Sequence, residues 1–165
     1  MTPRGATADD IPALVSLINS AYRVEDFFVN GDRTSAEDVG ARIEAPNASF
    51  LVVDGAAGEL AGAVYVDVKG SRGHFALLSV DPFLQRKGLG RSLIVAAEEH
   101  CRSAGCRSLD LEVVNLRSEL PAYYAALGFE AVGTAPFPDP SKLSRDAHLV
   151  LMTKRLVSEN AGQAS

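Results

Sequence analysis

The sequence predicts an α/β (α+β) fold in which a mixed central sheet of about six to seven strands carries helices on both faces. Apolar residues recur at helical spacing in four segments, near residues 7–23, 34–43, 88–104 and 120–127. Between them lie short apolar runs or segments in which apolar and polar residues alternate, as in strands. The expected order is therefore strand, two helices, three strands, helix, strand, helix and two strands.

Each expected helix has a recognisable start or stop. Thr7 precedes an acidic first turn, Ser35 is placed to cap the second helix, and Gly105 and Gly128 follow the last helical residues of the third and fourth. The expected strands cover residues 4–6, 50–53, 60–68, 74–80, 109–113, 129–134 and 148–155.

Composition sets limits on function. The 165 residues are 47% hydrophobic and 22% charged, which fits one globular domain over residues 1–157 with a flexible tail at 158–165. A net charge of −5 argues against nucleic acid as a partner. We expect no membrane span, no signal peptide and a cytoplasmic location. Cys101 and Cys106 lack the spacing of a zinc site, so we expect no metal, and Cys101 lies on an apolar helix face and should be buried.

The segment 77–94 is the most informative part of the chain. An apolar strand ends at Asp81-Pro82, and a turn bracketed by glycines opens a helix. The free N–H groups and the positive dipole end of such a helix start attract anions. Arg86, Lys87 and Arg91 add positive charge in a chain that is acidic overall, so we expect a site for a diphosphate.

Spacing narrows the choice of cofactor. A dinucleotide-binding turn needs a third glycine where this chain has Leu93, and a P-loop needs Gly-Lys-Ser/Thr, whereas Lys87 precedes Gly88 here. The remaining pattern, Gln85-x-x-Gly88-x-Gly90, resembles the coenzyme A loop of the GNAT superfamily of N-acetyltransferases. The order of elements also resembles that fold, over residues 4–156.

This resemblance implies a mostly antiparallel sheet in which two central strands, 74–80 and 108–114, splay apart around the pantetheine arm of acetyl-CoA. The backbones of Leu78 and Val80 would pair with the pantetheine, and the Val80 N–H would face the thioester carbonyl. The implied cofactor-binding residues are Leu78, Ser79, Val80, Gln85, Arg86, Lys87, Gly88, Leu89, Gly90, Arg91, Ser92 and Asn115.

A second segment of the family is an asparagine followed by a short helix and Tyr-x-x-x-Gly-Phe, which here corresponds to Asn115 and Tyr124 to Phe129. The resemblance implies that Tyr124 is the catalytic acid that protonates the departing thiolate. Asn115 would contact the pantetheine or cap a helix end, and its interval to Tyr124 is two residues longer than the commonest family spacing. Tyr123 lies in an apolar row with Leu120 and Leu127, so we expect it in the core.

Two features of the site stay open at this point. Four side chains or an ordered water could accept the proton of the amine: His74, Glu25, Asp26 and Glu112. Walls of the acceptor pocket could come from Phe27, Phe28, Arg33 and the 137–140 loop. Acidic residues such as Asp32 would favour a cationic amine, whereas Arg33 or Arg145 would favour an acceptor that bears a carboxylate.

The leading hypothesis is an N-acetyltransferase that transfers the acetyl group of acetyl-CoA directly to an amine of a small molecule or peptide, as a monomer or homodimer. The alternative is a non-catalytic domain that binds or senses acyl-CoA. A nucleotide-binding protein is disfavoured because both common phosphate-loop patterns fail. Retention of Tyr124 favours the enzyme over the sensor.

Overall fold

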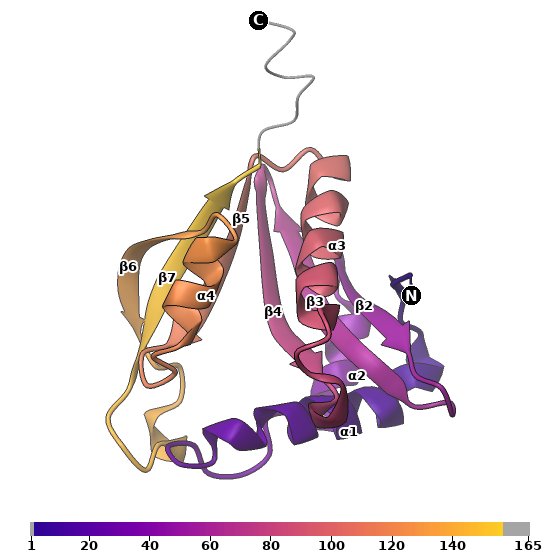
Figure 1. Ribbon diagram of the computed structural model, residues 1–165, viewed down its shortest axis with the longest axis horizontal. Coiled ribbons are helices and arrows are strands. Elements are labelled where there is room, and N and C mark those ends of the chain that lie inside the picture. Colours follow the sequence, from indigo (N-terminus) through magenta and orange to yellow (C-terminus); the bar gives the residue numbers. More distant parts are fainter. Residues whose placement is uncertain (1, 157–165) are drawn as a thin grey trace, which may run out of the picture.

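The computed structural model describes residues 2–156 and shows a seven-stranded sheet with helices on both faces (Figure 1). Its helices are α1 (Ile11–Tyr22), α2 (Ala36–Glu44), α3 (Leu89–Ser103) and α4 (Leu120–Ala126), with short 3-10 turns η1 (Ala8–Asp10), η2 (Arg23–Glu25), η3 (Pro82–Leu84) and η4 (Pro140–Lys142). Its strands are β1 (Arg4–Gly5), β2 (Ala48–Asp54), β3 (Leu60–Lys69), β4 (Arg72–Val80), β5 (Ser108–Val114), β6 (Glu130–Pro136) and β7 (His148–Arg155).

The strands lie in the order β1-β2-β3-β4-β5-β7-β6. Every neighbouring pair is antiparallel except β4 and β5, which run parallel at the centre of the sheet. The predicted fold class is therefore confirmed, including a sheet that is mixed but mostly antiparallel.

Each face of the sheet carries its own apolar cluster. One cluster lies beneath α1 and α2 and includes Leu14, Ile18 and Phe50, all at most 1% exposed. The other lies beneath α3 and α4 and includes Leu93 and Leu109. Helices on one side alone would leave half of this apolar surface in water, so the sheet needs cover on both faces.

The expected cap of α2 and the glycine stops of α3 and α4 hold, whereas Thr7 precedes the 3-10 turn η1 and α1 begins only at Ile11. Ser35 accepts the Asp38 N–H at the start of α2, and Gly105 follows α3 with a positive φ of 84°, a conformation that glycine adopts without strain. Cys101 is fully buried on the inner face of α3, and burial raises the pKa of its thiol to about 12. The predicted tail at 158–165 lies outside the described residues. Within residues 2–156, every helix is too short or too polar to cross a bilayer.

The central pair of strands separates soon after it forms. β4 and β5 are paired only from Arg72 to His74 on β4, and from there the two strands diverge (Figure 1). Just beyond, a bulge interrupts β4: Tyr65 pairs with Ala76 and Ala63 with Ser79, so two residues of β4 oppose one of β3. Leu77, in the bulge, has a positive φ of 56°. Because bulges bend a strand, this one turns β4 away from β5 and leaves a gap inside the sheet.

Candidate functional site

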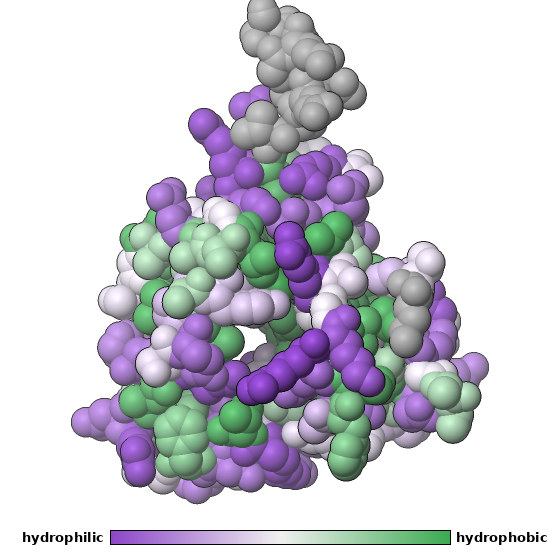
Figure 2. Space-filling view, in the orientation of Figure 1, coloured by the Kyte–Doolittle hydropathy of each residue, from purple (hydrophilic) through white to green (hydrophobic). Residues whose placement is uncertain are grey.

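The gap between β4 and β5 opens into a cleft of about 1480 Å³. Its walls come from both diverging strands, the turn 85–91, α4, η2 and the loop before η4. Figure 2 shows the molecule hollowed near the centre of one face, with strongly hydrophilic side chains beside the opening. A cleft of this size exceeds the usual range for drug-sized ligands, about 300–1,000 Å³, and suits a long ligand.

At one end of the cleft lies the start of α3. Its N-cap, Gly88, has a left-handed φ of 81°, and its first helical bond runs from the Ser92 N–H to the Gly88 carbonyl at 3.0 Å. The amides of Leu89, Gly90 and Arg91 precede that bond and therefore have no acceptor inside the helix. Together with the dipole of a 15-residue helix, they form a site for an anion.

Positive side chains border these amides. Arg86 and Arg91 line the cleft, and neither has a carboxylate within 4 Å in the described part of the chain. Gln85 joins the turn to β4 because its Nε2 donates to the Val80 carbonyl at 3.4 Å. The turn is thus a cationic, donor-rich end to the cleft, and its binding of a diphosphate stays a prediction.

The proposed cofactor-binding residues divide into two groups. Those that line the cleft are Leu78, Val80, Gln85, Arg86, Gly88, Leu89, Gly90 and Arg91. The other four, Ser79, Lys87, Ser92 and Asn115, do not, although Lys87 and Ser92 belong to the turn and to the first turn of α3. The Oδ1 of Asn115 accepts the His148 N–H of β7 at 2.8 Å, which gives this side chain a structural partner. A role in cofactor binding stays a prediction for all twelve residues.

The backbone of β4 presents a donor to the gap. The Asp81 N–H donates to the Ala61 carbonyl on β3 at 2.9 Å. Since backbone groups along a strand point alternately to its two sides, the amide of the preceding residue, Val80, is directed to the side that β5 has left. The bulge at Leu77 and Leu78 interrupts the alternation just before this point, so the alternation applies to Val80 and not to Leu78. The Val80 amide lies where a strand-like ligand could pair with it.

Tyr124 lies on α4 with its ring inside the protein and borders the cleft. It is 6% exposed and packs against Phe75 and Phe129, with ring centroids 6.0 and 5.8 Å away. Burial raises its pKa above the ordinary value for tyrosine, so the hydroxyl keeps its proton at neutral pH. The ring is held rigidly while the phenol remains a proton donor.

The expectation for Tyr123 was wrong. This side chain is 41% exposed and lines the cleft instead of packing in the core. Its hydroxyl lies 3.8 Å from the point where a Cβ at Gly90 would be, so α4 approaches the anion-binding turn across the mouth of the cleft. In a helix as short as α4, an apolar row need not face a core.

The far end of the cleft holds an ion pair between distant parts of the chain. Glu25 of η2 accepts from Arg117, which follows β5, at 3.0 Å, and both side chains are largely buried. Burial raises the pKa of Glu25, and the charge of Arg117 opposes that rise. Burial likewise raises the pKa of Tyr124 and of Tyr22, and the charge of Arg117 opposes that rise at both.

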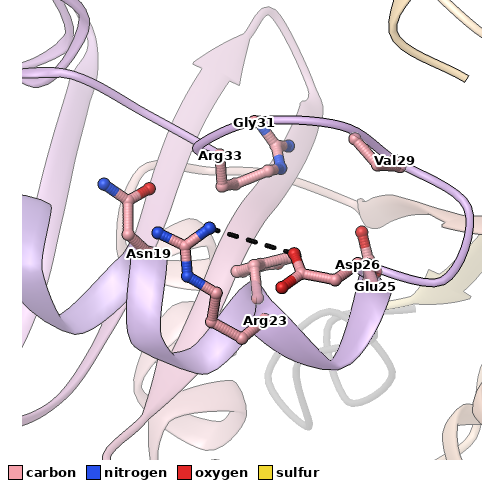
Figure 3. Close-up of a pocket in the computed structure, with 8 residues that line it drawn as sticks. Asn19, Arg23, Glu25, Asp26, Val29, Gly31 and Arg33 are labelled. Carbon is pink, nitrogen blue, oxygen red and sulfur yellow. Dashed lines mark ion pairs between the residues drawn. The ribbon is translucent and has the colours of Figure 1, made fainter.

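The other two acidic candidates for the base, Asp26 and Glu112, are paired with other side chains. Asp26 lines a small hollow beside η2, where Figure 3 shows it paired with Arg23, at 3.9 Å, and it does not line the large cleft. Glu112 does line the cleft, but its carboxylate binds the Nε2 of His74 at 2.8 Å. Glu25 is the acidic candidate that lines the cleft together with Tyr22 and Tyr124 and is paired with Arg117.

His74 forms a clamp at the point where the central strands separate. Its Nδ1 lies 2.8 Å from Asp67 on β3, while its Nε2 contacts Glu112 on β5. Burial by itself would lower the pKa of His74, but the hydrogen bonds and charges of Glu112 and Asp67 outweigh it and raise the pKa to about 9. At neutral pH the ring is therefore a cation that donates on both sides, and it is not available as a base.

This clamp predicts a pH dependence of stability. The folded-state pKa of His74 lies above its unfolded value of about 6.5, so its contribution is complete below that pH and is lost as pH rises through about 9. We expect urea unfolding to show a deficit for His74→Gln at pH 6 that narrows toward pH 9.5. An equal deficit at both pH values would contradict the clamp.

Sequence reasoning missed several residues of the cleft. Tyr22, Arg117 and Glu119 line it, and none was singled out. Tyr22 ends the apolar row of α1 and therefore reads as a core residue, although its position at the last turn was the signal that it borders a loop. Arg117 is recognisable only when Glu25, 92 residues away, is known to lie beside it. Within residues 2–156, no three His, Cys, Asp or Glu side chains are grouped to hold a metal ion.

Comparison with known proteins defines the class. Residues 12–129 match the Acetyltransferase (GNAT) family, so the chain belongs to that family. It is 30% identical over 144 residues to mycothiol acetyltransferase of Propionibacterium freudenreichii subsp. shermanii, an alignment that covers 83% of this chain. It is 33% identical over 129 residues to glucosamine 6-phosphate N-acetyltransferase 1 of Oryza sativa subsp. japonica, covering 74% of this chain and 76% of that protein. The chain spans only 45% of the length of the mycothiol acetyltransferase.

Solved structures agree on the fold. The ribosomal-protein-S18-alanine N-acetyltransferase of Escherichia coli superposes with a TM-score of 0.75 at 20% identity, covering 96% of this chain and 97% of that one. YncA of Salmonella typhimurium, solved with its cofactor acetyl-CoA, gives a TM-score of 0.74 at 22% identity, with 96% and 95% covered. At these identities the likeness concerns the fold.

Proposed function

We propose that this protein is an acetyl-CoA-dependent N-acetyltransferase that transfers the acetyl group directly to the amine of a small molecule or peptide. The observation that carries the proposal is the gap between β4 and β5, which leads from free strand edges to the open helix start at Gly88. Family membership and the N-acetyltransferase names of the relatives support the same class of reaction.

The residues present fit acetyl-CoA. Its diphosphate suits the free amides of residues 89–91 together with Arg86 and Arg91, because such amides and cations bind phosphate oxygens strongly. Its pantetheine arm, which carries two amides, suits the backbone of Leu78 and Val80 on the open edge of β4. When bound, acetyl-CoA supplies the activated acetyl group as a thioester.

The reaction then uses three groups of the chain. The amine nitrogen attacks the thioester carbon, the new C–N bond forms, and the C–S bond breaks. The Val80 N–H donates to the oxygen on which negative charge develops, a contribution typically worth about 3 kcal/mol. The Tyr124 hydroxyl, which is protonated at neutral pH, gives its proton to the departing sulfur, and the resulting phenolate takes up a proton from solvent to restore the enzyme.

Glu25 is the group that accepts the proton lost by the amine, directly or through a water molecule. It borders the cleft together with Tyr22 and Tyr124, and burial raises its pKa toward the range useful in a base. Its ion pair with Arg117 holds the carboxylate in place. Of the four acidic and basic candidates, Glu25 is the one whose carboxylate borders the cleft and is not held by His74 or Arg23.

A Glu25→Gln substitution is expected to lower kcat about 10- to 50-fold at pH 7 and to remove the acidic limb of the pH profile of kcat/KM. The amide keeps the shape and can still accept from Arg117, but it cannot take a proton. The contrasting variant is Asp26→Asn, whose side chain lies outside the large cleft and should change kcat less than twofold. Equal losses in both variants would contradict this role for Glu25.

Two measurements test the proposed function together. Calorimetry with acetyl-CoA should detect binding, and incubation with a panel of amines should release free coenzyme A with at least one acceptor. Binding without turnover across amino acids, amino sugars, polyamines and peptides would favour the sensor alternative. An absence of binding would overturn the proposal, since the turn 85–91 would then have another ligand.

A further inference from the structure

Arg33 is a cation held on the wall of the cleft. It lines both the cleft and the small hollow drawn in Figure 3, and its guanidinium lies over the Tyr22 ring, 5.2 Å from the centroid. The next residue, Thr34, is fixed to α1 because Asn19 Oδ1 accepts its N–H at 2.9 Å and Asn19 Nδ2 donates to its carbonyl at 3.2 Å. Arg33 therefore projects from an anchored backbone.

The carboxylates nearby are paired with other arginines, whereas Arg33 is not. Glu25 and Glu119 bind Arg117, and Asp26 and Asp32 bind Arg23. In residues 2–156, no carboxylate lies within 4 Å of the Arg33 guanidinium. Glu25 and Asp38 lie near enough for the charge of Arg33 to act toward lowering their pKa, but neither forms an ion pair with it.

The β6–β7 loop brings a second cation, Lys142, to the part of the cleft that Arg33 lines. The Asn30 N–H donates to the Lys142 carbonyl at 2.8 Å, and Val29 and Leu143 form a backbone bridge. Lys142 lines the cleft and likewise has no carboxylate within 4 Å in the described residues. By contrast, Arg145 lies 5.8 Å from the Phe27 ring centroid and does not line the cleft.

We propose that the acceptor is an amine that also carries an anionic group, a carboxylate or a phosphate, and that Arg33, assisted by Lys142, binds this group while the amine lies beside Glu25. The inference rests on the proposed function and specifies its substrate class. Arginine pairs with carboxylate and phosphate through two parallel hydrogen bonds, which suits either anion. A polyamine is disfavoured because its second ammonium would meet Arg33 and Lys142.

Matched acceptors test the proposal by kinetics. The pairs are glycine with glycinamide, for the carboxylate, and glucosamine 6-phosphate with glucosamine, for the phosphate. In at least one pair, we expect the wild type to use the anionic member with a kcat/KM at least tenfold higher. Arg33→Gln should lower kcat/KM for that member tenfold or more, mainly through KM, and leave its neutral partner within about twofold. Arg145→Gln is the matched control and should change neither.

Binding of the acetylated products separates this proposal from the proposed function. N-acetylglycine and N-acetylglucosamine 6-phosphate are compared with their uncharged counterparts by calorimetry, in the presence of coenzyme A. Preference for one anionic product, lost in Arg33→Gln, supports the anion site even if no acceptor releases coenzyme A. Release of coenzyme A with no preference for either anion, or an equal loss for charged and uncharged members in Arg33→Gln, overturns the anion site and leaves the proposed function standing.

Discussion

A Gly90→Glu variant is expected to bind acetyl-CoA at least a hundredfold more weakly than the wild type. Gly90 is the second residue of α3 and lines the cleft where the free amides lie. A glutamate there would direct its carboxylate into the space for the diphosphate. Two like charges about 4 Å apart near a protein surface repel by about 4 kcal/mol, which is roughly a thousandfold in affinity before relaxation of the side chain.

The matched control is Gly90→Ala. A Cβ at this position would lie 3.7 Å from Val80 Cγ2 and 3.8 Å from the Tyr123 hydroxyl, both ordinary contact distances. The backbone of Gly90 is helical, so alanine adopts it without strain. We expect calorimetry to give an affinity within about threefold of the wild type for alanine and an affinity at least a hundredfold weaker for glutamate. Normal binding by the glutamate variant, with its fold verified by circular dichroism, would refute the role of this turn.

For Tyr124→Phe, we expect kcat to fall about a hundredfold while the affinity for acetyl-CoA stays within about threefold. The ring and its packing against Phe75 and Phe129 remain, but the proton donor for sulfur is removed. Positioned acids and bases typically contribute 10²–10⁴-fold to a rate, and water can substitute in part. Release of coenzyme A at saturating substrates gives kcat, and single-turnover measurements verify that chemistry is the step affected.

The remote tyrosine Tyr65 provides the control for this variant. It lies on β3, packs against Phe50 beneath α1 and α2, and does not line the cleft. Tyr65→Phe removes a hydroxyl of the same kind and should leave kcat unchanged. If Tyr124→Phe also turned over at the wild-type rate, Tyr124 would have no part in protonating the leaving group.

Much of the fold was predictable because its signals are local. Caps such as Ser35, stops such as Gly105 and the change from helical to alternating periodicity lie within a few residues of the boundaries that they set. The bulge in β4 was not predictable from its residues. Leu77 is a buried apolar residue in an apolar run, and nothing in that run marks a left-handed conformation. The parting of the central strands was expected only through the resemblance to a family.

The candidate site likewise has one part that local sequence signals predict and another part that they do not. The turn from Gln85 to Arg91 is one continuous segment, so the sequence alone could suggest an anion site there. The proposed acceptor end joins residues 23–33 to the loop 137–145, which are more than 100 positions apart and follow no period. His74 also shows the limit, because an isolated histidine suggests a base until Asp67 and Glu112 are seen on either side of it.

The backbone bridge between Val29 and Leu143 connects the two halves of the divided sheet at their wide end. As a result the end of the cleft proposed for the acceptor is framed by two loops that belong to neither central strand, while the end proposed for acetyl-CoA belongs to β4 and α3. Under the proposed function, we expect insertions or exchanges in these loops to alter which amine is accepted and to leave binding of the acyl carrier unchanged.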